Sequence, residues 1–180
     1  MNFHKGTRRF VIVFPQLKIA LKFPIINVWR TLAWLWKRVT RGQWVEFKAE
    51  LTYPLEIPPY SWFLEGIANN LFEYGFFLAT KHEFLVPTYF SLFGVVNVQG
   101  VGEVYVLDRK THSQRMHKIL GDDWFIDTHH LSNPANFCIV GGKLAVLDYG
   151  SKGSHGVIEK HGYSIMDQLD LSPPVEGEKK

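Results

Sequence analysis

Apolar and polar residues alternate along residues 17–23, which is the pattern of a β-strand with one apolar face. The apolar face holds Leu17, Ile19, Leu21 and Phe23, and the other face holds Lys18, Ala20 and Lys22. Residues 9–14 form a second apolar run that ends at Pro15-Gln16, so they predict an antiparallel neighbour. An edge strand with solvated lysines would show the same alternation.

Residues 63–78 have the apolar rhythm of a helix. Its predicted apolar stripe consists of Ile67, Leu71, Tyr74 and Leu78. Glu73 lies at the edge of this stripe, so its carboxylate can turn inward toward Lys22. Residues 84–99 then predict two strands joined near Gly94.

A tight hairpin is predicted from the apolar runs 137–140 and 144–147, because Gly141-Gly142 between them can take the positive φ values that such a turn demands. The hairpin brings its two ends together, so Asn136 and Asp148 should lie close to one another. An amide oxygen beside a carboxylate is a pair suited to Mg²⁺. A surface hairpin ending in a turn is the alternative.

These motifs resemble those of the protein-kinase-like superfamily. Asn136, the hairpin and Asp148-Tyr149-Gly150 resemble its metal-binding hairpin, in which Tyr149 stands for the usual Phe. The segment Ile19-Ala20-Leu21-Lys22 is similar to its Val-Ala-Ile-Lys strand. The resemblance implies an α+β fold, with a small antiparallel-sheet amino-terminal lobe carrying one helix and a reduced carboxy-terminal lobe that ends shortly after the hairpin.

The resemblance also implies ATP and Mg²⁺ as cofactors. Lys22 would hold the phosphates, Ala20 would leave room for adenine, and Glu73 would orient Lys22, with Glu65 and Glu83 as rivals for that ion pair. Asn136 and Asp148 would bind the metal.

The sequence departs from the family at two places. Gly6 is the only glycine in the first forty residues, so the glycine-rich phosphate loop is missing. The family's spacing, counted back from the hairpin, places His129 on the family's His and Leu131 at the catalytic base, where it cannot accept a proton. Asp127 would serve as the base if the loop carries an insertion, and His129 or His130 are the alternatives.

Composition favours one compact domain. The chain of 180 residues is 46% hydrophobic, and we expect a single domain over residues 1–171, an insertion at 24–62 and a disordered tail at 172–180. The expected domain has no room for the helical substrate platform of a kinase. The single Cys138 excludes an internal disulfide and suits a reducing cytoplasm. The eight histidines are expected mainly at the surface.

Positive charge is concentrated in the first quarter of the chain. Residues 1–48 hold ten Lys or Arg and one acid, whereas the whole chain has a net charge of +3. Residues 25–41 predict an amphipathic helix. Its apolar stripe holds Ile25, Val28, Trp29, Leu32, Leu35, Trp36 and Val39, and its basic side holds Arg30, Lys37, Arg38 and Arg41. This helix could pack on the core, lie on a membrane surface, or bind nucleic acid or another acidic partner.

Two hypotheses about function follow. The first is a minimal ATP- and Mg²⁺-dependent phosphotransferase that acts on a hydroxyl of a protein or small molecule. The second is a catalytically inactive, pseudokinase-like binding module, such as a phage or accessory protein that docks on a partner through its basic amino-terminal region.

Overall fold

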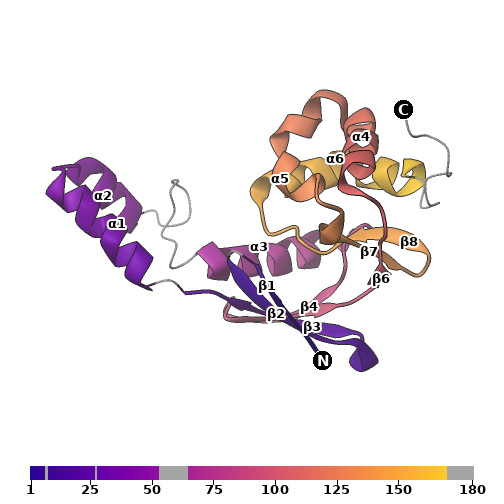
Figure 1. Cartoon of the computed structure of the whole chain (residues 1–180), viewed down its shortest axis with the longest axis horizontal. Helices are drawn as coiled ribbons and strands as arrows, with labels where there is room; N and C mark the ends of the chain where they lie inside the picture. Colours follow the sequence, from indigo (N-terminus) through magenta and orange to yellow (C-terminus); the bar gives the residue numbers. More distant parts are fainter. Residues whose placement is uncertain (7, 27, 53–64, 170–180) are drawn as a thin grey trace.

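The computed structural model of the chain describes residues 1–6, 8–26, 28–52 and 65–169. It is a mixed α+β structure with a five-stranded and a three-stranded antiparallel sheet (Figure 1). The expected tail at 172–180 lies outside the described residues, as does part of the expected insertion at 24–62.

The larger sheet has the strand order β1-β2-β3-β5-β4. The strands are β1 (Asn2–Lys5), β2 (Arg9–Phe14), β3 (Ile19–Pro24), β4 (Thr88–Leu92) and β5 (Val96–Gly100). The predicted strand pair is confirmed, although a 3-10 turn over Pro15–Leu17 delays the start of β3. Because β3 lies between β2 and β5, the alternative of an edge strand is wrong. Strand β1 was not predicted, since Asn2–Lys5 is short and largely polar.

Helix α3 (Glu65–Thr80) packs on β3, β4 and β5. The predicted apolar stripe is not the buried face of α3, because Leu71 and Leu78 are 42% and 49% exposed. The buried residues of α3 are Gly66, Ala68, Asn70, Glu73 and Phe76. Polar side chains are tolerated on this face because they find partners: Asn70 donates to the carbonyl of Gly94 at 2.8 Å.

The smaller sheet consists of β6 (Glu103–Val104), β7 (Phe137–Val140) and β8 (Lys143–Val146), in that order. The predicted hairpin is confirmed as β7 and β8, and Gly141 and Gly142 have φ values of 59° and 80°. Three helices lie on this side of the molecule: α4 (Arg109–Leu120), α5 (Thr128–Leu131) and α6 (Lys152–Gln168). The apolar pattern did not predict α4, which is mostly polar.

The apolar core lies in this second half of the structure. Its cluster includes Phe84, Met116, Leu131, Ile158 and Ile165. Among the described residues, Ala20 and Ala68 are the only buried apolar side chains that precede Phe76 in the chain. His112 is also fully buried, contrary to the surface position expected for the histidines, and one of its ring nitrogens lies 2.8 Å from the carbonyl oxygen of Leu131.

Helices α1 (Val28–Thr40) and α2 (Trp44–Thr52) pack against each other and form a hairpin that stands away from both sheets (Figure 1). The expectation that α1 packs on the core is therefore wrong. Side chains of its apolar stripe, such as Trp29 and Trp36, are exposed. No helix in the described ranges is both long enough and apolar enough to cross a bilayer.

Candidate functional site

A cavity of about 660 Å³ collects side chains from both halves of the structure. The turn between β1 and β2 and the two strands that follow it supply one wall. The region from 130 to 136 and the exit of the β7–β8 hairpin supply another. The predicted site residues that line it are Ala20, Lys22, Asn136 and Asp148, and the other lining residues include Lys5, Arg8, Arg9, Val13, Gln99, Val101, His130 and Leu147.

Lys22 and Glu73 form a buried ion pair. The ammonium nitrogen of Lys22 lies 2.5 Å from Glu73 Oε1 and donates a second hydrogen bond to the carbonyl of Leu147 at 2.7 Å. Burial lowers the pKa of Lys22 despite the opposing charge of Glu73. Ala20 and Lys22 lie on the same face of β3, where both are buried and line the cavity instead of facing bulk solvent.

The two rival glutamates pair elsewhere. Glu65 lies 2.7 Å from Arg8, and Glu83 lies 2.9 Å from Lys143 on the surface. Of the three acids considered for Lys22, the structure therefore places only Glu73 beside it.

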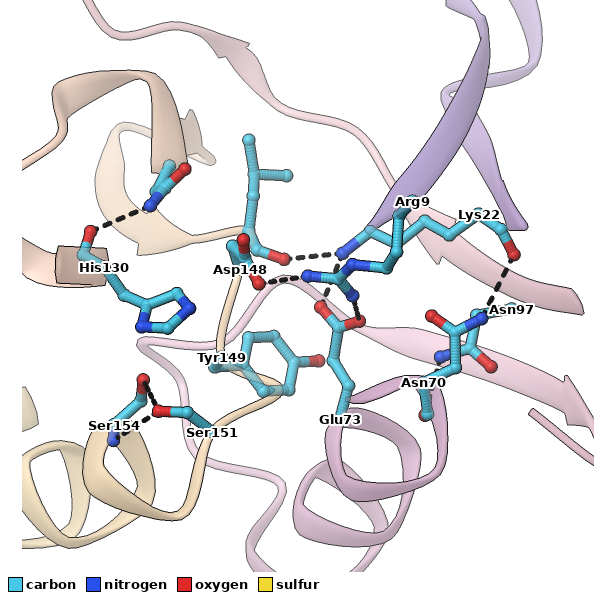
Figure 2. Close-up of polar contacts among 12 residues, drawn as sticks. Arg9, Lys22, Asn70, Glu73, Asn97, His130, Asp148, Tyr149, Ser151 and Ser154 are labelled. Atoms are coloured by element: carbon cyan, nitrogen blue, oxygen red, sulfur yellow. Dashed lines mark hydrogen bonds and ion pairs between the residues drawn. The ribbon is translucent and has the colours of Figure 1, made fainter. Parts of the chain in front are cut away.

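Arg9 joins Glu73 to Asp148, as Figure 2 shows. It is the first residue of β2, and its guanidinium donates to Glu73 Oε2 at 2.5 Å and to Asp148 Oδ1. Burial acts to raise the pKa of Asp148, but the charges of Arg9, Lys22 and His130 lower it to about 2. Burial likewise opposes the charge on Arg9, yet the two carboxylates raise its pKa overall.

The sequence analysis did not identify Arg9, because a basic residue at the start of a strand is an ordinary surface pattern. Only the pairing of β2 with β3, which aligns Val11 with Lys22, reveals that Arg9 lies on the cavity side.

Asn136 and Asp148 lie at the two ends of the hairpin, as predicted. The backbone N–H of Leu147 donates to the carbonyl of Asn136 at 2.7 Å, which ties the ends together. The Asn136 side-chain nitrogen donates to the carbonyl of His130 at 2.9 Å, so its amide oxygen is the atom that a cation would bind.

The oxygen donors of this pair fit Mg²⁺, which takes one or two protein oxygens and completes its shell with water and phosphate. The described residues contain no group of three or more His, Cys, Asp or Glu side chains placed to hold a metal. A metal that needs a full set of protein ligands, such as zinc, therefore does not suit the donors described.

Asp127 does not line the cavity. It is buried, and it accepts hydrogen bonds from the hydroxyls of Ser151 and Ser154, at 2.7 Å from Ser151. Its other oxygen lies 2.7 Å from His130 Nδ1. Asp127 stays a predicted base, but its carboxylate is enclosed by these partners and does not line the cavity, so it has no direct access to a hydroxyl bound there. The side chain of His129, the other predicted catalytic residue, lies outside the described part of the structure.

His130 bonds to Asp127 and also lines the cavity, so it is the titratable group through which Asp127 can act there. The hydrogen bond that His130 donates to the Asp127 carboxylate raises the pKa of His130 above its usual 6.5, although burial opposes the shift. Burial acts to raise the pKa of Asp127, but its bonds with His130 and Ser154 lower it overall. The available sequence signal was the spacing of three residues between Asp127, which precedes α5, and His130, which lies within it.

Leu131 occupies no base position at all. It is fully buried in the apolar core, and its carbonyl accepts a hydrogen bond from His112 Nε2 at 2.8 Å. The segment before the hairpin folds into α5 and a 3-10 turn over Pro134–Asn136. The kinase spacing that placed Leu131 at the catalytic base was counted along an extended loop, so it does not apply here.

Gln99 is a further cavity residue that the pattern did not single out. Its side-chain nitrogen donates to the carbonyl of Leu147 at 3.1 Å. Its side-chain oxygen is buried and has no hydrogen-bond partner among the described atoms. An acceptor left in this state costs about 1–3 kcal/mol, which a ligand that donates a hydrogen bond would offset.

Comparison of the chain with protein-family models, with curated proteins and with solved structures finds no match.

Proposed function

We propose that this protein is a minimal, kinase-like phosphotransferase that uses ATP and Mg²⁺ to phosphorylate a hydroxyl of a protein or small molecule. The observation that carries the proposal is one cavity lined by Lys22, Asp148 and Asn136, in which the buried Glu73 holds Lys22 in place. Charge neutralisation and positioning are most of what phosphoryl transfer requires of a protein.

The lining of the cavity suits a nucleotide. Val13, Ala20, Val101 and Leu147 offer apolar contact for a flat base, and Lys22 and its basic neighbours offer charge to phosphates. The amino group of adenine can donate to a buried acceptor such as Gln99. A cavity of about 660 Å³ is also within the range of small-molecule sites, about 300–1,000 Å³.

Each side chain then has one role. Lys22 binds phosphate oxygens and Glu73 orients Lys22. Asp148 and the amide oxygen of Asn136 hold Mg²⁺, which neutralises charge on the phosphates when bound. Lys5 and Arg8, which flank the turn between β1 and β2, bring side-chain charge to the phosphates. Kinases use the backbone amides of a glycine-rich loop for this purpose.

His130 accepts the proton of the acceptor hydroxyl, and Asp127 positions the imidazole through Nδ1. The hydroxyl oxygen forms a bond to the γ-phosphorus as the bond to the β–γ bridging oxygen breaks. ADP is the leaving group, and the proton taken by His130 passes to solvent. A cytoplasmic location, where ATP is available and Cys138 stays reduced, fits this chemistry.

Thermal unfolding with and without Mg-ATP tests the proposal. A ligand that binds only the folded state stabilises it by about 2.7 kcal/mol at one hundred times its Kd. We expect a Mg²⁺-dependent rise in Tm for the wild type and none for Asp148→Asn. Asp122→Asn, an exposed change outside the cavity, is the matched control and should keep the rise. No rise for the wild type at millimolar Mg-ATP would refute nucleotide binding.

The second candidate is a catalytically inactive kinase-like module that binds a partner. It is favoured by the Arg9–Asp148 ion pair, which engages the carboxylate that should hold the metal. Mg²⁺-dependent turnover of ATP separates the two candidates, because the module should show none while the phosphotransferase should lose turnover in Asp148→Asn.

A further inference from the structure

The α1–α2 hairpin exposes large apolar side chains that nothing in the described structure covers. These are Val28, Trp29, Leu32, Trp36, Trp44 and Val45. Trp29, Trp36 and Val45 are 82%, 70% and 80% exposed. Contiguous exposed apolar residues of this kind mark sites of interaction with a protein or a membrane.

The apolar stripe of α1 is buried along only part of its width. Leu35 and Val39 are half-buried. Trp29, Leu32 and Trp36 follow the spacing i, i+3, i+7 on the same stripe and are exposed. Packing against α2 therefore leaves these three side chains available.

A small basic pocket lies at the carboxyl end of α1. Its volume is about 220 Å³, and it is lined by Trp34, Lys37, Arg38, Arg41 and Gln43. The Arg38 guanidinium lies 4.9 Å from the centroid of the Trp34 ring and donates to Gln43 Oε1 at 2.8 Å, which holds the pocket wall in place. Among the described residues, its lining holds three cations and no acid, which suits the pocket to an anion.

Charge complementarity identifies the partner as a negatively charged surface. Residues 28–48 contain five Lys or Arg and a single acid, Glu46. The surface must also accept tryptophan and aliphatic side chains. Duplex nucleic acid attracts the basic residues but offers no apolar surface to exposed Val28, Leu32 and Val45. The boundary between lipid headgroups and acyl chains attracts the basic residues and also takes up these apolar side chains.

We propose that the α1–α2 hairpin is a docking surface for an anionic phospholipid bilayer. Trp29, Leu32 and Trp36 enter the headgroup–acyl boundary, and the pocket beside Lys37 and Arg41 takes a lipid phosphate. Membrane docking of this kind is independent of the proposed phosphotransfer, because none of these residues lines the larger cavity.

Cosedimentation of the full chain with vesicles tests the proposal. One vesicle set is phosphatidylcholine alone, and the other contains about 30% phosphatidylserine at physiological ionic strength. We expect binding to the anionic vesicles, a blue shift of tryptophan fluorescence and little binding to phosphatidylcholine. Absence of binding to the anionic set, or equal binding to both sets, overturns the proposal.

Two double variants separate the contributions. Lys37→Gln with Arg41→Gln should weaken binding about 25-fold, at about fivefold for each cation near the surface. Lys110→Gln with Lys118→Gln, on exposed positions of α4, is the matched charge control and should bind like the wild type.

Trp29→Ala with Trp36→Ala should abolish the blue shift and weaken vesicle binding at least tenfold, while Phe125→Ala, an exposed aromatic outside the hairpin, should do neither. Loss of binding in the charge variant with full binding in the tryptophan variant would show attraction to any polyanion and would overturn insertion into lipid. Unchanged thermal unfolding of the exposed variants confirms that each one is folded.

Discussion

Arg9 donates a hydrogen bond to Asp148, the carboxylate at the exit of the β7–β8 hairpin, and so connects the larger sheet to the smaller one. The same guanidinium bonds to Glu73, which already pairs with Lys22. Two cations thus balance two acids at the wall of the cavity, where Asp148 is the most exposed of the four. A metal bound by Asp148 must therefore compete with Arg9, and the affinity for Mg²⁺ depends on where this guanidinium goes.

Replacement of Arg9 tests that competition. Arg9→Met leaves Glu73 and Asp148 with one cation between them, so we expect the free energy of unfolding without ligand to fall by about 3 kcal/mol. The rise in Tm produced by Mg²⁺ should become larger than in the wild type. Chemical denaturation with and without Mg²⁺ measures both effects.

Arg8→Met is the matched control, because Arg8 is partly exposed and pairs with Glu65 instead. Its cost should stay within about 1 kcal/mol, with an unchanged response to Mg²⁺. A smaller response to Mg²⁺ in Arg9→Met would show that Arg9 assists the metal site.

The low pKa of Asp148 predicts how stability changes in acid. A carboxyl whose pKa falls to about 2 on folding stabilises the protein above its unfolded pKa of about 3.9, and this contribution is lost as the pH falls toward 2. Asp148→Asn should therefore be about 1–2 kcal/mol less stable than the wild type at pH 7, with the side chain's partial exposure taken into account. The difference should vanish near pH 2. A difference that is constant with pH would contradict the assigned ion pair.

Transfer activity should depend on the protonation of His130. A base acts in its neutral form, so the rate should rise with pH through a pKa above 6.5, the direction set by Asp127. His130→Gln should lower kcat by about 10²–10⁴. Asp127→Asn should move the rising limb to lower pH, a change that a purely structural role would not produce.

The raised pKa of His130 also makes the free energy of unfolding depend on pH. A raised histidine pKa contributes stability below about pH 6.5, and the contribution is lost as the pH rises through the folded pKa. His117→Gln, at an exposed position, should leave both pH profiles unchanged.

Substitutions of Leu131 test whether the segment before the β7–β8 hairpin buries this side chain in the core. Leu131→Asp supplies the acid that the resemblance to kinases would place at this position. It should put a charge in the core and lower the free energy of unfolding by more than about 4 kcal/mol, without any gain in activity. Leu131→Ala should cost about 2–5 kcal/mol, whereas Leu78→Ala on an exposed face should cost less than about 1 kcal/mol. A folded Leu131→Asp with increased transfer would contradict the fold of this loop.

The elements predicted from the sequence are those whose patterns are local. Alternation identified β2 and β3, and Gly141-Gly142 identified the hairpin, because each signal depends on adjacent residues. The buried face of α3 was predicted wrongly, since it is defined by polar contacts to distant strands, as between Asn70 and Gly94. Helix α4 was missed because few of its residues are apolar.

The site was predictable to the same extent. Lys22 and Glu73 were paired correctly, and the hairpin placed Asn136 near Asp148. Arg9 and the enclosure of Asp127 by two serines depend on long-range contacts that no spacing encodes.

The uneven distribution of apolar residues has a consequence for how the protein opens. The larger sheet holds its interior with hydrogen-bonded polar side chains, while the clustered apolar core belongs to the helices and the smaller sheet. Cooperative units with few buried apolar contacts exchange their amide hydrogens first. The amide hydrogens of the larger sheet should therefore be less protected from exchange than those of the apolar core. A molecule bound between the two halves would stabilise the larger sheet by linking it to the more stable half.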